Sequence, residues 1–294
     1  MAHLICLLGV EQAHAQTVRS DTIPFELTAF NNVIVPVVIN GTDTLRLMFH
    51  SSFTGVSVTR SGLEHTTTLH ADGEGIAHSW GGETQSGVSV GNTVRIGQNT
   101  WDSVLVTIDE QSGQESDGKF GWDHFADRVL EIDYDRSELV VHPSMPTLPD
   151  GATLLPFEER NGSLYVQSTI AFGETSVADL FMFHTGYGGT CILGTGFMSR
   201  FGNGPALDTL GTKKLSDSFG NVLLNITARI PSLTFADHEF KNVHIQVMDR
   251  RSHFEDSVLG NDILRRFNSW IDFRAHRIYL KPSKAMGATF SDRF

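Results

Sequence analysis

Cysteine is scarce in this chain, which has 294 residues but only two cysteines, Cys6 and Cys191. Cleavage of an N-terminal leader would remove the first and leave Cys191 alone. No internal disulfide is then expected, and the fold must hold by its core. Cys191 lies in an apolar, strand-like run, where we interpret it as a small core residue and not as a nucleophile.

Basic residues and long apolar runs are scarce as well. The chain has 22 Lys and Arg against 34 Asp and Glu, which gives a formal net charge of -12. Without a basic run there is nothing to neutralise phosphates, so no nucleic-acid partner is predicted. No run approaches the roughly 20 apolar residues of a membrane-spanning helix, so no membrane partner is predicted either. The 40% of hydrophobic residues and 28 glycines are typical of a globular protein with a substantial core.

The first residues resemble a secretory signal peptide. A short apolar run covers residues 4–10, and the small-x-small sequence Ala13-His14-Ala15 follows it. Residues 1–15 are therefore predicted to be a signal peptide cleaved after Ala15. The mature protein is expected to be periplasmic or secreted.

The two halves of the chain repeat each other. Residues 24–50 align with 156–184 after a two-residue insertion, and each segment opens with Pro-Phe-Glu and closes with Met-Phe-His. Residues 117–143 align with 256–282 without a gap, so that Gly121 of "DGKFGWDHF" faces Gly260 of "DSVLGNDIL". A fixed internal offset identifies a duplicated unit, so two homologous lobes are predicted.

Within each half the local signals are mostly β. β-branched runs end at Gly turns, and "VRIGQNTWDSVLVTI" indicates a hairpin that "RIPSLTFADHEFKNVHIQVM" repeats. One short helix per half is predicted after Gly121 and Gly260, capped by Asp123 and by Asn261 or Asp262. The predicted organisation is an N-terminal lobe over residues 22–142, a proline-rich linker over 143–152, a C-terminal lobe over 153–283 and a tail over 284–294.

The repeat resembles one lobe of the aspartic proteases, and the whole chain resembles bacterial retropepsin-like proteins in which two such lobes are fused. The resemblance covers most of residues 22–283, and "SVLGNDILRRFNSWIDFRAHRIYLKP" is its most specific part. It implies an all-β fold with few short helices and a cleft between two β lobes. In that family each lobe contributes an Asp-Thr-Gly loop. Here the two aspartate positions fall on His50 of "HSS" and His184 of "HTG".

This double replacement bears directly on catalysis. Aspartic proteases need two carboxylates that share one proton, so that one activates water while the other stays protonated. Two imidazoles would repel each other as cations and tend to be neutral or singly charged together near pH 7. Ser51 and Thr185 keep the hydroxyl of the family threonine in the two loops. Gly186 keeps the family glycine, whereas Ser52 replaces it and is expected to crowd the turn if the backbone there needs positive φ or close approach.

Three hypotheses follow from these residues. In the first, the protein is a pseudoprotease that binds a peptide or an unfolded protein segment between its lobes. In the second, it is an active peptidase that uses His50 and His184, with or without a metal between the two rings. No HExxH-type spacing supplies a third metal ligand. In the third, both histidines are ordinary polar ends of strands, and the function lies on another face.

Four residues are predicted to contact a ligand in the cleft. The segments "GGETQSG" and "SDSFGN" fall where the resemblance places hairpins over the cleft, so Trp80 and Phe219 beside them are candidates together with Ser52 and Gly186. No cofactor is predicted. Both halves of the site lie in one chain, so a monomer is expected.

Overall fold

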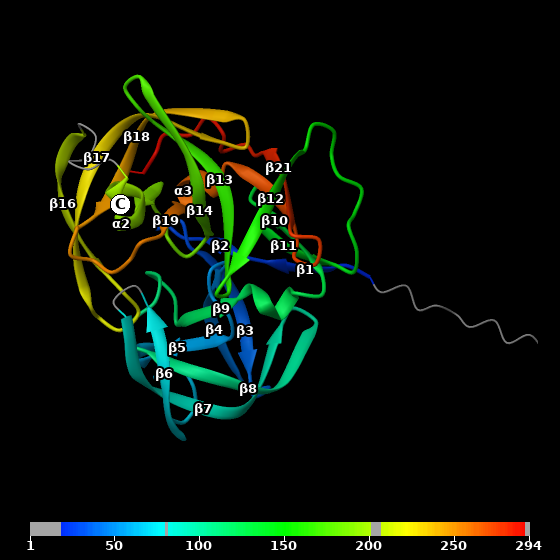
Figure 1. The fold of residues 1–294 in the computed structure, drawn as a ribbon. Coiled ribbons are helices and arrows are strands. Elements are labelled where there is room, and N and C mark those ends of the chain that lie inside the picture. Colours follow the sequence, from blue (N-terminus) through cyan, green and yellow to red (C-terminus); the bar gives the residue numbers. More distant parts are fainter. Residues whose placement is uncertain (1–18, 80–81, 201–206, 292–294) are drawn as a thin grey trace, which may run out of the picture.

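The computed structural model describes residues 19–79, 82–200 and 207–291, so the predicted signal peptide and Trp80 lie outside the described residues. In these ranges the chain is almost entirely β, arranged as two lobes (Figure 1). Among the described residues, no helix has the length and apolar character needed to cross a membrane.

The first half of the chain forms the lower lobe in Figure 1 and three strands of the sheet above it. Its elements, in chain order, are β1 (Asp21–Pro24), β2 (Glu26–Leu27), β3 (Val33–Ile39), β4 (Asp43–His50), β5 (Val56–Thr59), α1 (Arg60–Leu63), β6 (Gly73–Ser79), β7 (Gly82–Ile96), β8 (Asn99–Asp109), β9 (Gly118–Gly121), the 3-10 helix η1 (Trp122–Phe125), β10 (Val129–Asp133) and β11 (Glu138–His142).

The second lobe repeats this order. Its elements are β12 (Thr153–Arg160), β13 (Ser163–Phe172), β14 (Thr175–His184), β15 (Cys191–Leu193), α2 (Thr195–Ser199), β16 (Asp208–Ser216), β17 (Val222–Phe235), β18 (His238–Met248), β19 (Ser257–Gly260), α3 (Asn261–Leu264), β20 (Phe267–Asp272) and β21 (Arg277–Pro282).

Strand pairing reproduces the sequence repeat. In the first lobe β4 runs parallel to β9, with His50 opposite Gly121, and in the second β14 runs parallel to β19, with His184 opposite Gly260. The pairings β3–β7 and β13–β17 close the sheet of each lobe on itself. The predicted all-β fold with two homologous lobes is therefore confirmed.

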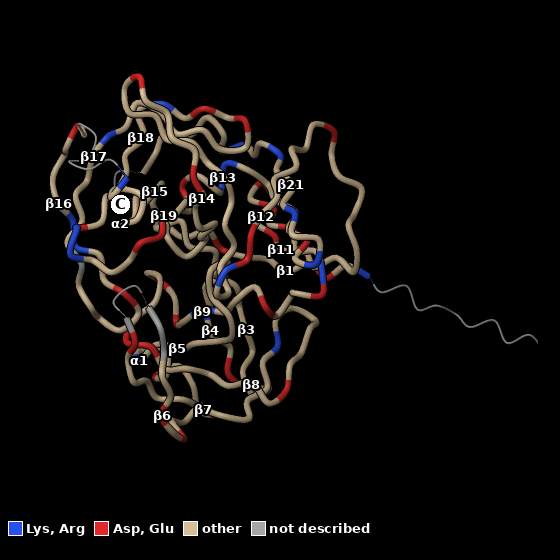
Figure 2. Tube along the Cα trace, in the orientation of Figure 1, with Lys and Arg blue, Asp and Glu red and all other residues tan. Residues whose placement is uncertain are grey.

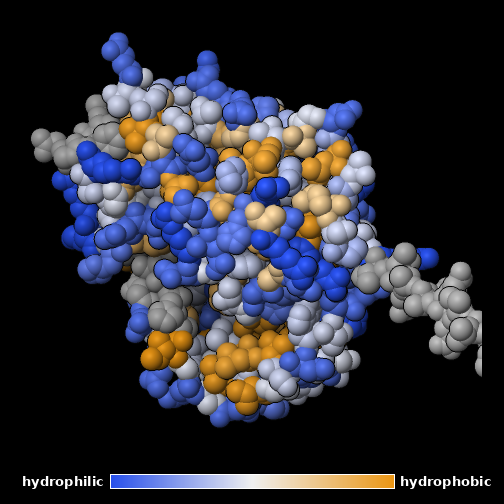
Figure 3. All heavy atoms as spheres, turned by 45° about the vertical axis from the view of Figure 1, so that its right-hand side comes forward, coloured by the Kyte–Doolittle hydropathy of each residue, from blue (hydrophilic) through white to orange (hydrophobic). Residues whose placement is uncertain are grey.

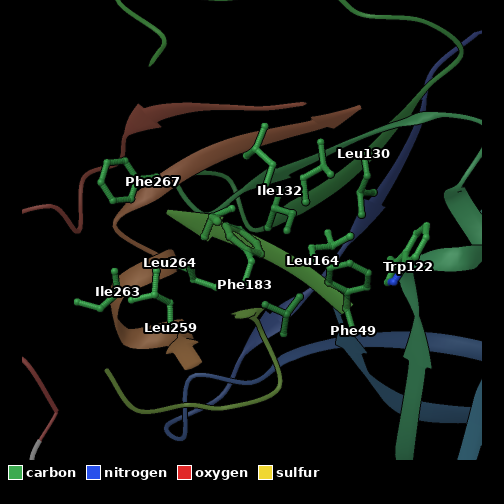
Figure 4. Close-up of a cluster of buried hydrophobic side chains, with 14 of the residues drawn as sticks. Phe49, Trp122, Leu130, Ile132, Leu164, Phe183, Leu259, Ile263, Leu264 and Phe267 are labelled. Carbon is green, nitrogen blue, oxygen red and sulfur yellow. The ribbon is translucent and has the colours of Figure 1, made fainter. Parts of the chain in front are cut away.

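One sheet joins the lobes. Strands β1, β11 and β10 of the first half continue into β20, β21 and β12 of the second half, and β10 pairs with β20 from Val129 to Ile132. Side chains continue the junction, because Trp122 stacks on Phe273 with ring centroids 4.9 Å apart. Buried residues of both halves, among them Phe49 and Phe183, meet in one apolar cluster (Figure 4). The lobes therefore share a core, which fixes the two histidine loops relative to each other.

The short helices differ from prediction in their caps. Gly121 and Gly260 occupy the N-cap positions of η1 and α3, and neither cap has a side-chain hydrogen bond. In α3 the free amides of Asn261 and Asp262 instead donate to the carbonyl oxygens of Tyr187 and Gly189. The prediction that Asp123, Asn261 or Asp262 caps a helix is therefore wrong: in α3 the neighbouring chain already satisfies these amides, and in the first lobe Oδ1 of Asp123 accepts the N–H of Gly55 at 2.9 Å.

Candidate functional site

Strand alternation explains the repeated Met-Phe-His motif. Successive side chains of a strand point to opposite faces. Phe49 and Phe183 are therefore buried in the apolar core, at 0% and 1% exposure. The flanking Met48 and His50, and Met182 and His184, face the other way and line a cleft of about 410 Å³ between the lobes. The phenylalanine anchors each strand end, and the methionine and histidine face the cleft.

The two histidines meet in this cleft. Their ring centroids are 4.4 Å apart, with 60° between the ring planes. His184 is buried and His50 is half-buried. Ser52 donates its backbone N–H to Nδ1 of His50 at 3.2 Å, so this nitrogen is the acceptor of a neutral ring. The structure thus brings together two histidines that lie 134 positions apart in the sequence.

Both rings are held neutral. Burial lowers the pKa of His184 to about 3, and the Lys119 ammonium acts in the same direction. Burial also lowers the pKa of His50 well below its ordinary value, with further contributions from His184 and Lys119. Neutral imidazoles with so little affinity for a proton are weak general bases and cannot hold a proton to donate at neutral pH.

This predicts a specific loss of stability in acid. The unfolded histidine protonates below about pH 6.5, whereas the folded His184 does not until about pH 3. Stability is thus complete above pH 6.5 and falls as the pH drops toward the folded pKa. The expected loss for His184 is roughly 2 kcal/mol at pH 5, from about 1.4 kcal/mol per pH unit. Urea unfolding of wild type and His50→Asn/His184→Asn at pH 7 and 5 measures it, and equal losses in both proteins would contradict it.

A symmetric set of hydrogen bonds lies beneath the rings. The N–H of Ser51 donates to Oγ1 of Thr185 and the N–H of Thr185 donates to Oγ of Ser51, both at 3.0 Å. Each hydroxyl then donates across the interface, Ser51 to the carbonyl of Phe183 at 2.6 Å and Thr185 to that of Phe49 at 3.0 Å. Both residues are 0% exposed. Ser51 and Thr185, predicted among the catalytic residues, hold the two loops together below the cleft.

Removing these hydroxyls should uncouple the loops. Ser51→Ala and Thr185→Val are each expected to cost about 1–3 kcal/mol of unfolding free energy, because buried backbone groups lose their partners. The two costs should not add, since both hydroxyls hold the same pair of loops. A double-mutant cycle by chemical denaturation measures the coupling. Strict additivity would show that the two hydroxyls act independently.

The loop positions Ser52 and Gly186 both line the cleft, as predicted. Neither has positive φ, so the turn itself does not require glycine at either position. A Cβ atom at Gly186 would lie 2.2 Å from Cδ2 of His50. Glycine is needed there so that the His50 ring can pack against the backbone. Ser52 is accommodated because its Oγ donates to the carbonyl of Phe183 at 3.2 Å.

The β16–β17 hairpin of the second lobe reaches the first lobe. At its turn, the carbonyl of Ser218 accepts the N–H groups of Glu110 and Gln111 at 2.9 and 3.0 Å. Nε2 of Gln111 donates to the carbonyl of Asp217 at 2.6 Å. Asp217 and Ser218 line the cleft. Phe219, predicted to contact a ligand, is half-buried in the same turn and is not among the residues that line the cleft.

Lys119 is one of the cleft residues that sequence reasoning missed, and it is the buried charged one with an ion pair. It is buried, lines the cleft, and forms an ion pair of 2.8 Å with Asp109. Its Nζ also donates to Oγ of Ser218 at 2.7 Å and lies 4.8 Å from the centre of the Phe53 ring. The signal was present in the repeat, where Lys119 of "GKFG" aligns with Val258 of "SVLG".

The side chains around the two histidines are poorly suited to bind a metal ion. Among the described residues, no group of three or more His, Cys, Asp or Glu side chains is placed to hold a metal ion. The Lys119 ammonium, close enough to lower the pKa of both rings, would also repel a cation there. The arrangement suits uncharged or anionic groups better than a metal ion.

Fold and site together define a two-lobed all-β protein with a neutral histidine pair at the base of its interlobe cleft. Comparison of the sequence with protein-family models gives no match, and comparison with curated proteins gives none either.

Proposed function

We propose that this protein is a retropepsin-like aspartic protease homologue without aspartyl protease activity, which binds an extended peptide or unfolded protein segment in its interlobe cleft. The observation that carries the proposal is the histidine pair. Two equivalent loops, joined across the lobes by reciprocal hydrogen bonds, present imidazoles where the resemblance expects carboxylates. The loops retain a paired arrangement, but neither ring can supply the shared proton that the aspartyl mechanism requires.

The walls of the cleft favour an extended chain as ligand. β16 is the last strand in the order of its sheet, and its residues 213–216 line the cleft. An edge strand offers unpaired N–H and C=O groups, to which a peptide can add by backbone hydrogen bonds. Met48 and Met182 line the cleft on the two lobes and provide flexible apolar surface for side chains. Because one chain supplies both walls, the proposed binding unit is a monomer. Because residues 1–15 resemble a signal peptide, the proposed location is the periplasm or the cell exterior.

Mass spectrometry of a peptide mixture tests this proposal. The mature protein and a His50→Ala/His184→Ala variant are incubated with the mixture at several pH values, with and without chelator, and retained and cleaved peptides are identified. The proposal predicts retention without cleavage. Cleavage that disappears in the variant would overturn it in favour of a histidine-based peptidase, and sensitivity to chelator would then indicate a metal. If the protein neither retains nor cleaves any peptide, the function lies outside the cleft.

A further inference from the structure

The internal repeat shows which cleft positions differ between the lobes. Strand pairing shows which positions are equivalent. Val56 of β5 pairs with Phe120 of β9, and in the same way Cys191 of β15 pairs with Leu259 of β19. Ser57 of β5 pairs with Thr107 of β8, and in the same way Ile192 of β15 pairs with Gln246 of β18. Three neighbouring positions on β5, β8 and β9 thereby correspond to three on β15, β18 and β19. The first lobe has Ser57, Asp109 and Lys119 where the second has Ile192, Met248 and Val258.

The two sets have opposite chemistry. Ile192, Met248 and Val258 are at most 2% exposed and belong to one apolar cluster with Met182 of the cleft wall. The set in the first lobe is buried too, but it is polar. Oδ2 of Asp109 accepts hydrogen bonds from Oγ of Ser57 and from Nζ of Lys119, both at 2.8 Å. The first lobe therefore carries a buried ion pair where the second has apolar side chains.

The fold does not require that ion pair. Burying two charges is costly, and apolar residues of similar volume are often neutral or stabilising in place of a buried pair. The second lobe shows that apolar side chains fill the equivalent positions within the same strand pairing. The charged residues of the first lobe are thus better explained by what they present to the cleft than by folding.

Lys119 presents its ammonium to the cleft, whose described lining has more basic than acidic side chains. Lys213 and Lys214 also line the cleft, and β16 carries a blue stretch in Figure 2. Asp217 is the one acidic lining residue among those described, and its Oδ1 accepts the N–H groups of Phe219 and Asn221 at 3.0 and 2.8 Å. In a chain of net charge -12, the cleft is a basic exception.

We propose that Lys119 is a specificity-determining residue of the cleft and that it selects peptide segments carrying an Asp or Glu side chain. This inference rests on the proposed peptide-binding function and names its ligand class. The ligand carboxylate replaces the hydroxyl of Ser218 as acceptor on Nζ, and Asp109 holds the ammonium in place. On the opposite wall, Met182 is the member of the apolar cluster that lines the cleft, and it contacts an uncharged side chain of the ligand. When the ligand carboxylate takes the place of the Ser218 hydroxyl, the hydrogen bond between Lys119 and the β16–β17 turn is lost.

The test uses pools of N-acetylated, C-amidated peptides in which one central position is fixed as Glu, Asp, Gln or Asn, and one pool with a free C-terminus. Wild type is compared with S57I/D109M/K119V, which copies the apolar set of the second lobe into the first. D109N/K119Q is a second, neutral variant that keeps hydrogen-bonding groups, in case the first does not fold. Both variants leave the net charge unchanged, and K241M, which removes a largely exposed lysine outside the cleft lining, controls for the loss of a lysine elsewhere.

Wild type and K241M are expected to bind the Glu and Asp pools roughly tenfold or more tightly than their amide counterparts, as a hydrogen bond to a charged group allows. Both neutral variants should lose this preference and still bind the Gln and Asn pools. Equal binding of acidic and amide pools by wild type would overturn this inference alone, as would a preference that survives in the variants. A preference confined to the free C-terminus would overturn the side-chain assignment. Binding of no pool would overturn the proposed function and this inference with it.

Discussion

The variant His50→Asp/His184→Asp is expected to cleave peptides in acidic solution, where the wild type does not. The two loops already converge, with ring centroids 4.4 Å apart, and reciprocal hydrogen bonds between Ser51 and Thr185 hold them. Two carboxylates so close together cannot both ionise, so one should keep a proton while the other activates water. General acid and base catalysis together should raise the cleavage rate by at least roughly a hundredfold over the wild type.

Two controls make this result interpretable. His50→Asn/His184→Asn has side chains of the same shape as the aspartates but no ionisable group, and it should stay inactive. Thermal unfolding and peptide retention must show that the aspartate variant folds and still binds. An aspartate variant that folds and binds but cleaves nothing between pH 3 and 7 would show that the loops do not form a carboxylate-dyad site, and the family resemblance would then fail at its central point.

Arg266→Met is expected to cause the largest loss of stability, about 3–5 kcal/mol of unfolding free energy. The Arg266 guanidinium is 2% exposed and donates to carbonyl oxygens of the C-terminal tail, at 2.7 Å to Ala288 and 3.1 Å to Met286. It also lies 4.1 Å from the centre of the Phe290 ring. Its loss leaves these buried carbonyls without their donor and weakens the attachment of the tail, which Ser291 also keeps by donating its N–H to Oδ2 of Asp262 at 2.7 Å.

Arg265 provides a matched control from the next position. Its side chain is 17% exposed and pairs with Asp262 at 2.7 Å, whereas the hydrogen bonds to the carbonyls of Met286 and Ala288 in the tail come from Arg266. Arg265→Met should therefore cost clearly less than Arg266→Met in urea unfolding. The Arg266 guanidinium also lies 3.6 Å from the Asp262 carboxylate. Equal losses in the two variants would show that Arg266 stabilises the protein through Asp262 and not by holding the tail.

The internal repeat made most of the fold predictable. Repeated Met-Phe-His and Gly-centred segments fixed which strand ends are equivalent, and the parallel pairs β4–β9 and β14–β19 have the registers that this alignment implies. The hairpins predicted in the two halves are β7–β8 and β17–β18. What a single sequence could not give is the sheet that joins the lobes, because pairing between β10 and β20 depends on contacts between segments far apart in the chain.

The site was only half predictable. His50, His184, Ser52 and Gly186 were found because a repeated motif marks them, and the structure brings them to one cleft. Lys119 was missed because a charged residue in a short strand usually indicates a solvated face. Its burial becomes understandable only with Asp109, which lies on another strand and completes the ion pair. Surface hydrophobicity alone would not have singled out one site either, since Figure 3 shows apolar side chains at several separate places on one face of the molecule.

Hydrogen exchange of the full chain, with and without a retained peptide, tests the central claim most directly. If the peptide binds between the lobes, backbone amides should become protected in both halves together, in residues 48–53 and 111–119 of the first and 182–188 and 213–218 of the second, which contain cleft-lining positions. Protection in one lobe alone, or on strands remote from the histidine pair, would contradict binding in the interlobe cleft.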